Sequence, residues 1–447
     1  MKKFIASWIV PIVLALVGVM FVYVWVNRDT ASELSERLPG TTGPGLLADE
    51  APPTGPIRGE LIRFDGVASE LPGGWPRFRG ENFDNISREN YALSTSWPAD
   101  GPKVLWSLDV GEGYAGAAVL NGRVYILDYD RENRADALRC LSLDDGREIW
   151  RYSYPVKVKR NHGMSRTVPA VTDKFVVTLG PKCHVTCLDS QTGEFLWMKN
   201  LVGEFSATVP LWYAGQCPLI DNGRAIIATG GDALLIAVDC ATGQIVWKSP
   251  NPLGWKMTHS SIMPAEFDGK RMYIYCGSGG VAGISAEDGS ILWQSTEWRI
   301  RIATIASPLV IGEGRIFLSG GYNSGSMMLE IKNQDGRMVA QPTFKLQAEV
   351  FGATQHTPIF YKGYIYGIRP DGQLVCLSTD GRVVWTSGSA HRFGIGPYMI
   401  ANGLIYAMND MGVLTLIKAT PAGYRQLAQA KVLEGPDSWA PMALASG

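Results

Sequence analysis

Short stretches of alternating apolar and polar residues, separated by tight turns, recur along most of the chain. In the clearest copy, residues 237–247 read Ala-Val-Asp-Cys-Ala-Thr-Gly-Gln-Ile-Val-Trp, which predicts a strand end, a turn at Thr242-Gly243 and a second strand. The corresponding turn glycines are Gly146, Gly193, Gly243, Gly289, Gly336 and Gly381. They stand 47, 50, 46, 47 and 45 residues apart. This is the period of a four-stranded propeller blade, so the pattern predicts an all-β propeller.

Two further positions of the repeat carry characteristic side chains. Five copies end in a tryptophan at one fixed register: Trp150, Trp197, Trp247, Trp293 and Trp385. One ring per repeat is typical of a structural role, in which each ring docks its blade on the neighbouring blade. Cys140, Cys187 and Cys376 share another position, where we expect small, buried, free thiols. No spacing typical of a zinc or haem site occurs, so we expect no metal.

The pattern Ala-x-Asp-x-x-Thr-Gly-x-x-x-Trp resembles the repeat of the PQQ-like, or quinoprotein-like, β-propellers, and residues 237–247 match it at every fixed position. The resemblance runs from about Trp75 to the last residue and implies an eight-bladed propeller. That family includes quinone-dependent dehydrogenases, the propeller lipoprotein of the outer-membrane barrel assembly machinery, and membrane-anchored bacterial PQQ-binding-like proteins. Trp75-Pro-Arg-Phe-Arg-Gly80 is similar to the lead-in found in the last group. The resemblance is therefore specific for the fold and leaves the function open.

The N-terminus carries a long apolar run, from Phe4 to Val26, behind Lys2 and Lys3. Its 23 residues would form a helix of about 34 Å, enough to span a bilayer. Because no small-residue cleavage site follows the run, we favour an uncleaved anchor (residues 1–27) over a cleaved signal peptide. The two lysines keep the N-terminus in the cytoplasm, which places the rest of the chain in the periplasm of a bacterium.

The remaining chain divides into a linker and one domain. Residues 28–74 are rich in proline and glycine and are expected to form a flexible linker, and residues 75–447 the propeller. Charge is balanced, with 41 Lys and Arg against 42 Asp and Glu, and no basic cluster indicates a nucleic-acid partner.

The segments that precede the innermost strands are the candidate binding region. A proline marks that strand in seven blades, and four of the five histidines fall just before these prolines. Since innermost strands line a propeller's channel, we expect these side chains to converge on one mouth that binds an anionic or aromatic ligand, or a peptide segment. The candidates are His162, Arg166, Gln216, Trp255, His259, Arg299, Arg301, Gln355, His356, His391, Arg392 and Trp439.

These features favour a monomeric, membrane-anchored periplasmic scaffold that binds envelope proteins, peptide segments or a ligand without catalysis. The alternative that the resemblance implies is a quinoprotein oxidoreductase with pyrroloquinoline quinone and calcium. The dehydrogenases of that family carry adjacent cysteines beneath the cofactor and a calcium set of Glu, Asn and Asp. No two cysteines are adjacent here, and of the mouth segments only the last offers an acid, Asp437. We therefore expect no cofactor.

The last blade is expected to be incomplete. Residues 439–447 match an innermost strand and the turn after it, and Val104–Val110 is placed to serve as the outer strand. The two middle strands have no counterpart, so we suspect a fragment, with Glu60–Phe64 as a partial substitute. Unpaired backbone groups on such an edge would favour aggregation.

Overall fold

The computed structural model describes residues 16–20, 23, 57–98 and 100–447, and it divides the chain into two compact units, Met1–Ala51 and Pro52–Gly447. In the first unit, residues 16–20 are helical. Most of the expected anchor, residues 1–27, lies outside the described residues. Within the described parts of the chain, no helix is both apolar and long enough to cross a membrane.

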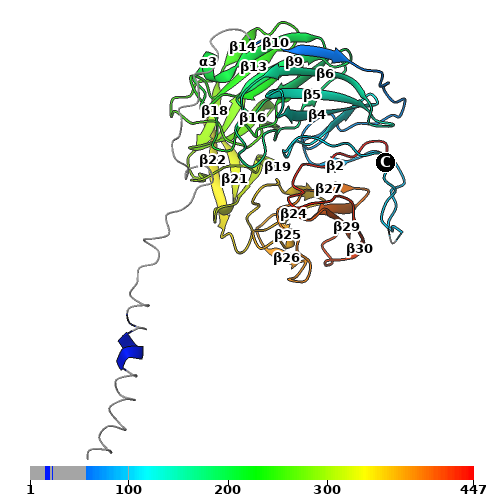
Figure 1. Ribbon diagram of the computed structural model, residues 1–447. Coiled ribbons are helices and arrows are strands. Elements are labelled where there is room, and N and C mark those ends of the chain that lie inside the picture. Colours follow the sequence, from blue (N-terminus) through cyan, green and yellow to red (C-terminus); the bar gives the residue numbers. More distant parts are fainter. Residues whose placement is uncertain (1–15, 21–22, 24–56, 99) are drawn as a thin grey trace, which may run out of the picture. The chain divides into compact units, whose positions relative to one another are not determined.

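The described residues of the second unit form seven antiparallel sheets, each built from four consecutive strands (Figure 1). The first strands are β3 (Ala118–Leu120), β7 (Ala170–Val171), β11 (Leu219–Asp221), β15 (Met263–Phe267), β19 (Leu309–Gly312), β23 (Ile359–Tyr361) and β27 (Tyr398–Ala401). The second strands are β4 (Arg123–Asp130), β8 (Phe175–Leu179), β12 (Arg224–Ala228), β16 (Lys270–Gly277), β20 (Arg315–Gly320), β24 (Tyr364–Ile368) and β28 (Leu404–Met408).

The remaining strands complete each sheet. The third strands are β5 (Ala135–Ser142), β9 (His184–Asp189), β13 (Leu235–Asp239), β17 (Gly280–Ser285), β21 (Gly325–Gln334), β25 (Leu374–Ser378) and β29 (Val413–Lys418). The fourth strands are β6 (Glu148–Pro155), β10 (Phe195–Asn200), β14 (Ile245–Lys248), β18 (Ile291–Ser295), β22 (Arg337–Leu346), β26 (Val383–Thr386) and β30 (Gln426–Lys431). One short helix, α3 (Leu201–Phe205), follows β10.

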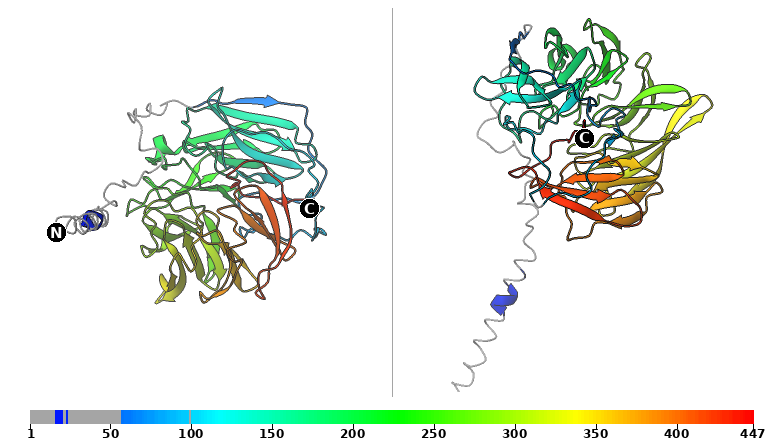
Figure 2. Two further views of the ribbon diagram at one scale, coloured as in Figure 1. Left: turned by 60° about the horizontal axis from the view of Figure 1, so that its bottom comes forward. Right: turned by 90° about the vertical axis from the view of Figure 1, so that its right-hand side faces the viewer.

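The seven sheets follow one another around a centre, from the cyan first sheet to the orange and red last one (Figure 2). The first strands of neighbouring sheets contact one another, as β3 does β7 and β19 does β23. Apolar clusters fill the spaces between neighbouring sheets, for example Val177 and Val185 of the second sheet with Ile227 and Ile236 of the third. This arrangement confirms the expected all-β propeller, in which the first strand of each sheet is innermost.

The repeated small residues and tryptophans lie opposite each other in the sheets. Cys140 pairs with Trp150, Cys187 with Trp197 and Cys376 with Trp385, and a register shift follows each pair. Cys140, Cys187 and Cys376 are free and buried, as expected, and so are the other four cysteines. A small residue is needed there because the indole covers the space beside the third strand. In the fourth sheet, a Cβ on Gly283 would lie 2.1 Å from the Trp293 indole nitrogen.

The N-terminal part of the second unit adds a strand to the first sheet. β1 (Glu60–Arg63) pairs antiparallel with β6, so that Glu60 faces Ser153 and Arg63 faces Trp150. The hypothesis that residues 60–64 substitute for a strand of the last blade is therefore wrong. The outer edge of β6 offers free backbone groups to a segment that is close to it in sequence, and β1 satisfies them.

The segment after β1 runs along the channel. Trp75 pairs with Val119 of β3, and the Pro76 carbonyl accepts a hydrogen bond from Val171 of β7 at 2.8 Å. Farther along, β2 (Ile86–Ser87) pairs in parallel with β27. Residues 75–87 thus contact the innermost strands of the first, second and last sheets. We name them the channel segment.

A buried carboxyl group lies inside the first sheet. Asp136 of β5 is fully buried; its Oδ2 accepts a hydrogen bond from the Tyr154 hydroxyl at 2.8 Å, and its Oδ1 has no partner. Burial raises the pKa of Asp136 to about 7, although the Tyr154 hydrogen bond opposes the shift. The native state therefore binds this proton more tightly than the unfolded chain does.

We predict that Asp136 makes the wild-type protein less stable as the pH rises. The native pKa of about 7 lies above the unfolded value, so the protonated Asp136 carboxyl contributes fully to stability below pH 4. This contribution falls as the pH rises and is lost once the pH has passed through 7. Asp136→Asn cannot ionise, so its stability relative to wild type should increase by more than about 1.4 kcal/mol between pH 4.5 and pH 8. Urea unfolding at both pH values measures this, with Asp335→Asn in the exposed β21–β22 turn as control. If the difference in unfolding free energy between Asp136→Asn and the wild type were the same at both pH values, the raised pKa of Asp136 would be contradicted.

Candidate binding site at the channel mouth

The connections that lead into the innermost strands are tied together by a series of side-chain hydrogen bonds. The Val168 amide donates to the Cys217 thiol at 3.2 Å, and the Cys217 amide donates to the Ser261 hydroxyl at 2.9 Å. The series continues from the Ser261 amide to Ser307 at 3.0 Å and from the Ser307 amide to Thr357 at 2.8 Å. Our sequence reading missed this set. Its signal is a small polar residue directly before the strand's proline, as in Cys217-Pro218, Ser307-Pro308 and Thr357-Pro358.

Three of these connections enclose a cleft of about 420 Å³. It is formed by residues 208–212 before β11, residues 254 and 256–259 before β15 and residues 299–304 before β19, with Ser278 from the β16–β17 turn. Of the predicted mouth residues, His259, Arg299 and Arg301 line it. We call it the mouth cleft. Its volume falls within the range typical of ligand sites.

Aromatic rings cover one side of the mouth cleft. The Trp212 ring lies parallel to that of Tyr322 in the β20–β21 turn, with centroids 6.4 Å apart and an interplanar angle of 6°. It is also 6.2 Å from the His259 ring. The Trp212 indole N–H is buried and has no hydrogen-bond partner among the described residues. A buried donor without a partner is uncommon in folded proteins.

The charged side chains of the mouth cleft all have the same sign. Lys256, Arg299 and Arg301 line it and are exposed, whereas no Asp or Glu is among the described residues that line it. Burial, and next the positive charge of Arg166, lower the pKa of His259 to about 4. His259 is therefore neutral near pH 7. The cleft presents three cations to solvent beside neutral, partly aromatic walls.

Arg166 and Trp439 form a stack on another side of the mouth. The Arg166 guanidinium lies over the Tyr114 ring, 5.5 Å from its centroid, and Tyr114 stacks on Trp439 at 5.2 Å. The Trp439 indole donates to Asp410 at 2.8 Å, while Arg166 donates to the carbonyls of Asn161 and of the exposed His162. Burial lowers the pKa of Arg166 to about 10. These side chains hold the first, second and last sheets together and do not line the mouth cleft.

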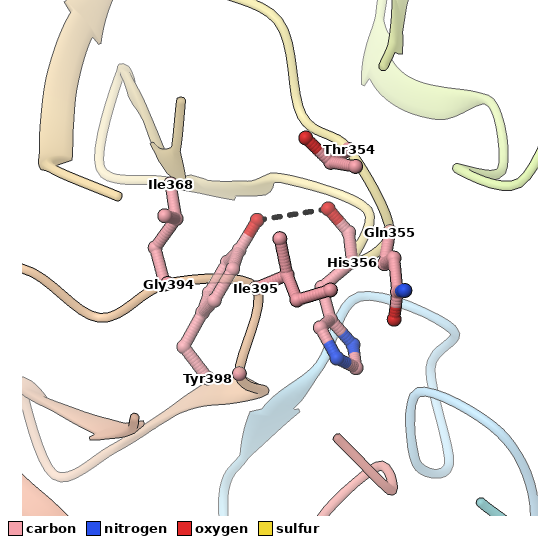
Figure 3. Close-up of a pocket in the computed structure, with 8 residues that line it drawn as sticks. Thr354, Gln355, His356, Ile368, Gly394, Ile395 and Tyr398 are labelled. Atoms are coloured by element: carbon pink, nitrogen blue, oxygen red, sulfur yellow. Dashed lines mark hydrogen bonds between the residues drawn. The ribbon is translucent and has the colours of Figure 1, made fainter. Parts of the chain in front are cut away.

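Gln355 and His356 line a second, much smaller pocket, of about 10 Å³, with Tyr398 and Ile395 (Figure 3). The Tyr398 hydroxyl donates to the His356 carbonyl at 3.0 Å. Burial lowers the pKa of His356 to about 4, and its Nε2 is buried without a partner. The pocket has room for about one water molecule, so it suits a structural water better than a ligand.

Four other expected mouth residues have local roles. Gln216 is fully buried, and its amide group exchanges hydrogen bonds with the backbone of Ala228 at 2.6 and 3.0 Å. Trp255 is buried in the apolar cluster between the third and fourth sheets. The His391 ring lies 5.0 Å from Tyr424, and exposed Arg392 pairs with Gln373 through its backbone. Gln216 and Trp255 are buried in the fold and do not line the mouth cleft.

The comparisons with known proteins agree with the repeat and the sheets. A family model described as outer membrane protein assembly factor BamB matches residues 134–387, more than half of the chain. The chain belongs to this family of PQQ-like propellers. Two relatives are named outer membrane protein assembly factor BamB. The one from Yersinia pestis is 24% identical over 325 residues, covering 69% of this chain and 75% of its own. The one from Moranella endobia is 20% identical over 328 residues, covering 69% and 67%.

Two solved structures are also similar to this PQQ-like propeller. BamB from Moraxella catarrhalis has a TM-score of 0.49 at 15% identity and covers 78% of this chain and 93% of its own. Quinohemoprotein alcohol dehydrogenase from Comamonas testosteroni has a TM-score of 0.45 at 13% identity and covers 84% and 75%.

Proposed function

We propose that this protein is a monomeric, non-catalytic scaffold of the bacterial envelope, which binds other proteins or peptide segments at the mouth of its propeller. The proposal rests on the composition of the mouth cleft. It combines three exposed cations with aromatic and apolar walls, and no acidic residue or cysteine is among the described residues that line it. Such a lining favours recognition of a partner over acid–base or nucleophilic chemistry. The relatives' name, assembly factor, supports the same function class.

The location that we propose follows from the N-terminal sequence. Residues 4–26 would anchor the chain in the cytoplasmic membrane, with Lys2 and Lys3 on the cytoplasmic side. The linker would give the propeller reach in the periplasm. Its expected range, 28–74, includes β1, so within the described residues its C-terminal part belongs to the first sheet.

For the fold, we propose an eighth blade position between the last and the first sheet. Two observations support it. Trp106 contacts Gly146 and donates to the Leu143 carbonyl at 2.9 Å, as Trp150 contacts Gly193 and donates to Gln191. Residues 442–445 pack among apolar residues of the first and last sheets. The expectation that Val104–Val110 serves as the outer strand is wrong, because residues 104–110 form no strand.

A quinoprotein oxidoreductase is the alternative from another function class, and the residues present do not fit its cofactor. Calcium is held by several carboxylate and carbonyl oxygens. Among the described residues, no group of three or more His, Cys, Asp or Glu could hold a metal ion. The seven buried cysteines also lack the adjacent pair that the dehydrogenases carry. We therefore derive no reaction through the quinone.

A single crosslinking experiment tests both the scaffold function and its location. The full chain is expressed in a Gram-negative host, and a membrane-impermeant crosslinker is added to intact spheroplasts. We expect adducts with envelope proteins, because the propeller would be exposed outside the cytoplasmic membrane. Adducts that form only after lysis would contradict the periplasmic location. A chain that gives no adducts in either preparation would contradict the scaffold function.

A further inference from the structure

We propose that the mouth cleft binds an acidic peptide segment, in which carboxylates flank an aromatic or aliphatic side chain. The proposal deepens the scaffold function and rests on it, since it names the chemistry of the partner. Two kinds of groups meet in the cleft: exposed cations and an apolar floor. A ligand that uses both needs negative charge and an apolar side chain.

The apolar floor of the mouth cleft suits a single large side chain. Met257 and Ile300, both 5% exposed, come from two of the connections, and Trp212 comes from the third. Leu211, which lines the cleft, is 44% exposed. Leu253, directly before the lining residue Gly254, is 51% exposed and extends the apolar surface beyond the cleft. Burying an aromatic or aliphatic side chain of a partner against these groups would be favourable.

The cations select the sign of the partner's charge. Lys256, Arg299 and Arg301 come from two connections, so their charges lie on two sides of the floor. Glu297, the acid nearest to Arg299 in sequence, lies 2.8 Å from Lys345 and is absent from the lining. Arginine forms paired hydrogen bonds with carboxylates, and like charges on a partner would be repelled. A basic segment is therefore disfavoured.

The apolar floor beside the cations favours a peptide over a simple anion. An extended segment can place one apolar side chain on the floor and its neighbouring carboxylates on the cations. An inorganic anion would contact the cations and leave the floor unused. The shape and chemistry of the cleft together point to a peptide that carries negative charge beside a hydrophobic anchor.

The test measures binding of synthetic peptides to the purified full chain in detergent micelles by fluorescence anisotropy. The probe is a labelled ten-residue peptide with one phenylalanine flanked on each side by two aspartates, in a Gly/Ser background. We expect saturable binding that is weakened at least tenfold when lysines replace the aspartates or when serine replaces the phenylalanine. We also expect about tenfold weaker binding for Arg299→Ala/Arg301→Ala and for Trp212→Ala.

The matched control is Lys270→Ala/Arg337→Ala, which removes two exposed cations from β16 and β22, outside the cleft. It should bind the acidic peptide as the wild type does, and thermal unfolding of every variant verifies its fold. The proposal is overturned if the acidic peptide does not bind, if the lysine peptide binds equally well, or if inorganic phosphate displaces the peptide completely. It is also overturned if the cleft variants bind as tightly as the control.

The crosslinking experiment separates this proposal from the scaffold function. A chain that crosslinks to envelope proteins but binds no acidic peptide overturns the cleft proposal and leaves the scaffold function standing. A chain that binds the peptide but forms no adducts in spheroplasts or after lysis overturns the scaffold function on which the proposal rests.

Discussion

Replacement of Arg79 with alanine is expected to lower the free energy of unfolding by about 3 to 5 kcal/mol. Arg79 belongs to the channel segment and is 3% exposed. Its guanidinium donates to the carbonyls of Phe83 at 2.9 Å, Thr357 at 3.0 Å and Pro358 at 3.0 Å. Burial lowers its pKa to about 10, so it stays charged at neutral pH. Alanine would leave three carbonyls without this donor and a cavity at the centre of the ring.

Urea unfolding of the purified protein measures the effect, and three variants define its cause. Arg79→Lys keeps the charge but lacks the planar fork that reaches three carbonyls, so we expect most of the loss to remain. Arg79→Met fills part of the volume without donors and should be similarly destabilised. Arg88→Ala removes an exposed arginine that pairs with Asp84, and it should lower the free energy of unfolding by less than about 1 kcal/mol. A loss for Arg79→Ala as small as that for Arg88→Ala would contradict the role assigned to the channel segment.

Trp150→Ala is expected to destabilise the protein by about 3 to 5 kcal/mol as well. The Trp150 ring is 1% exposed, and its indole N–H donates to the Gln191 carbonyl of the second sheet at 3.0 Å. The ring covers Gly193, whose φ of +75° favours glycine and whose added Cβ would lie 2.6 Å from the indole. The substitution removes the indole's contact with the second sheet and leaves the Gln191 carbonyl without this donor.

Two companion variants test whether docking is the cause. Gly193→Ala changes the other partner of the same contact and should also be destabilising, because the added methyl group meets the ring and the backbone is strained. Phe195 stacks on Tyr152 but is 45% exposed. Phe195→Ala should therefore lower the free energy of unfolding by less than about 1.5 kcal/mol. Thermal or urea unfolding ranks the three variants by their loss of stability. If Phe195→Ala equalled Trp150→Ala, the fixed tryptophan register would have no special role in docking.

The repeated part of the fold could be predicted from the sequence because its determinants are local. A turn such as Asp239-Cys-Ala-Thr242-Gly243 fixes its own geometry: the Asp239 carboxylate accepts hydrogen bonds from the Thr242 amide and hydroxyl, both at 2.8 Å. The alternating strand that follows places Trp247 toward its neighbour. Each unit repeats this pattern of turn and alternating strand, so the number and kind of strands follow from the period of the repeat. The small residues opposite the tryptophans follow for the same reason.

The composition of the mouth was predictable only in part. The prolines before the innermost strands indicated which segments lie at the mouth, and the structure brings His259, Arg299 and Arg301 of those segments to one cleft. The sequence could not separate them from Gln216, which is fully buried and bound to the backbone of its own sheet. Both kinds of residue stand at similar positions in the repeat. Which of them faces solvent depends on the packing of the neighbouring connections.

What the sequence by itself determined is therefore the all-β propeller, its four-stranded units and the register of its docking tryptophans. Tertiary structure alone decided that β1 joins the first sheet, that the channel segment runs along the innermost strands, and that three connections enclose the mouth cleft. The physical reason is the distance along the chain. Arg79 and the Thr357 carbonyl are 278 residues apart, and no local periodicity encodes such a contact. It forms only when the ring of sheets brings distant segments together around one centre.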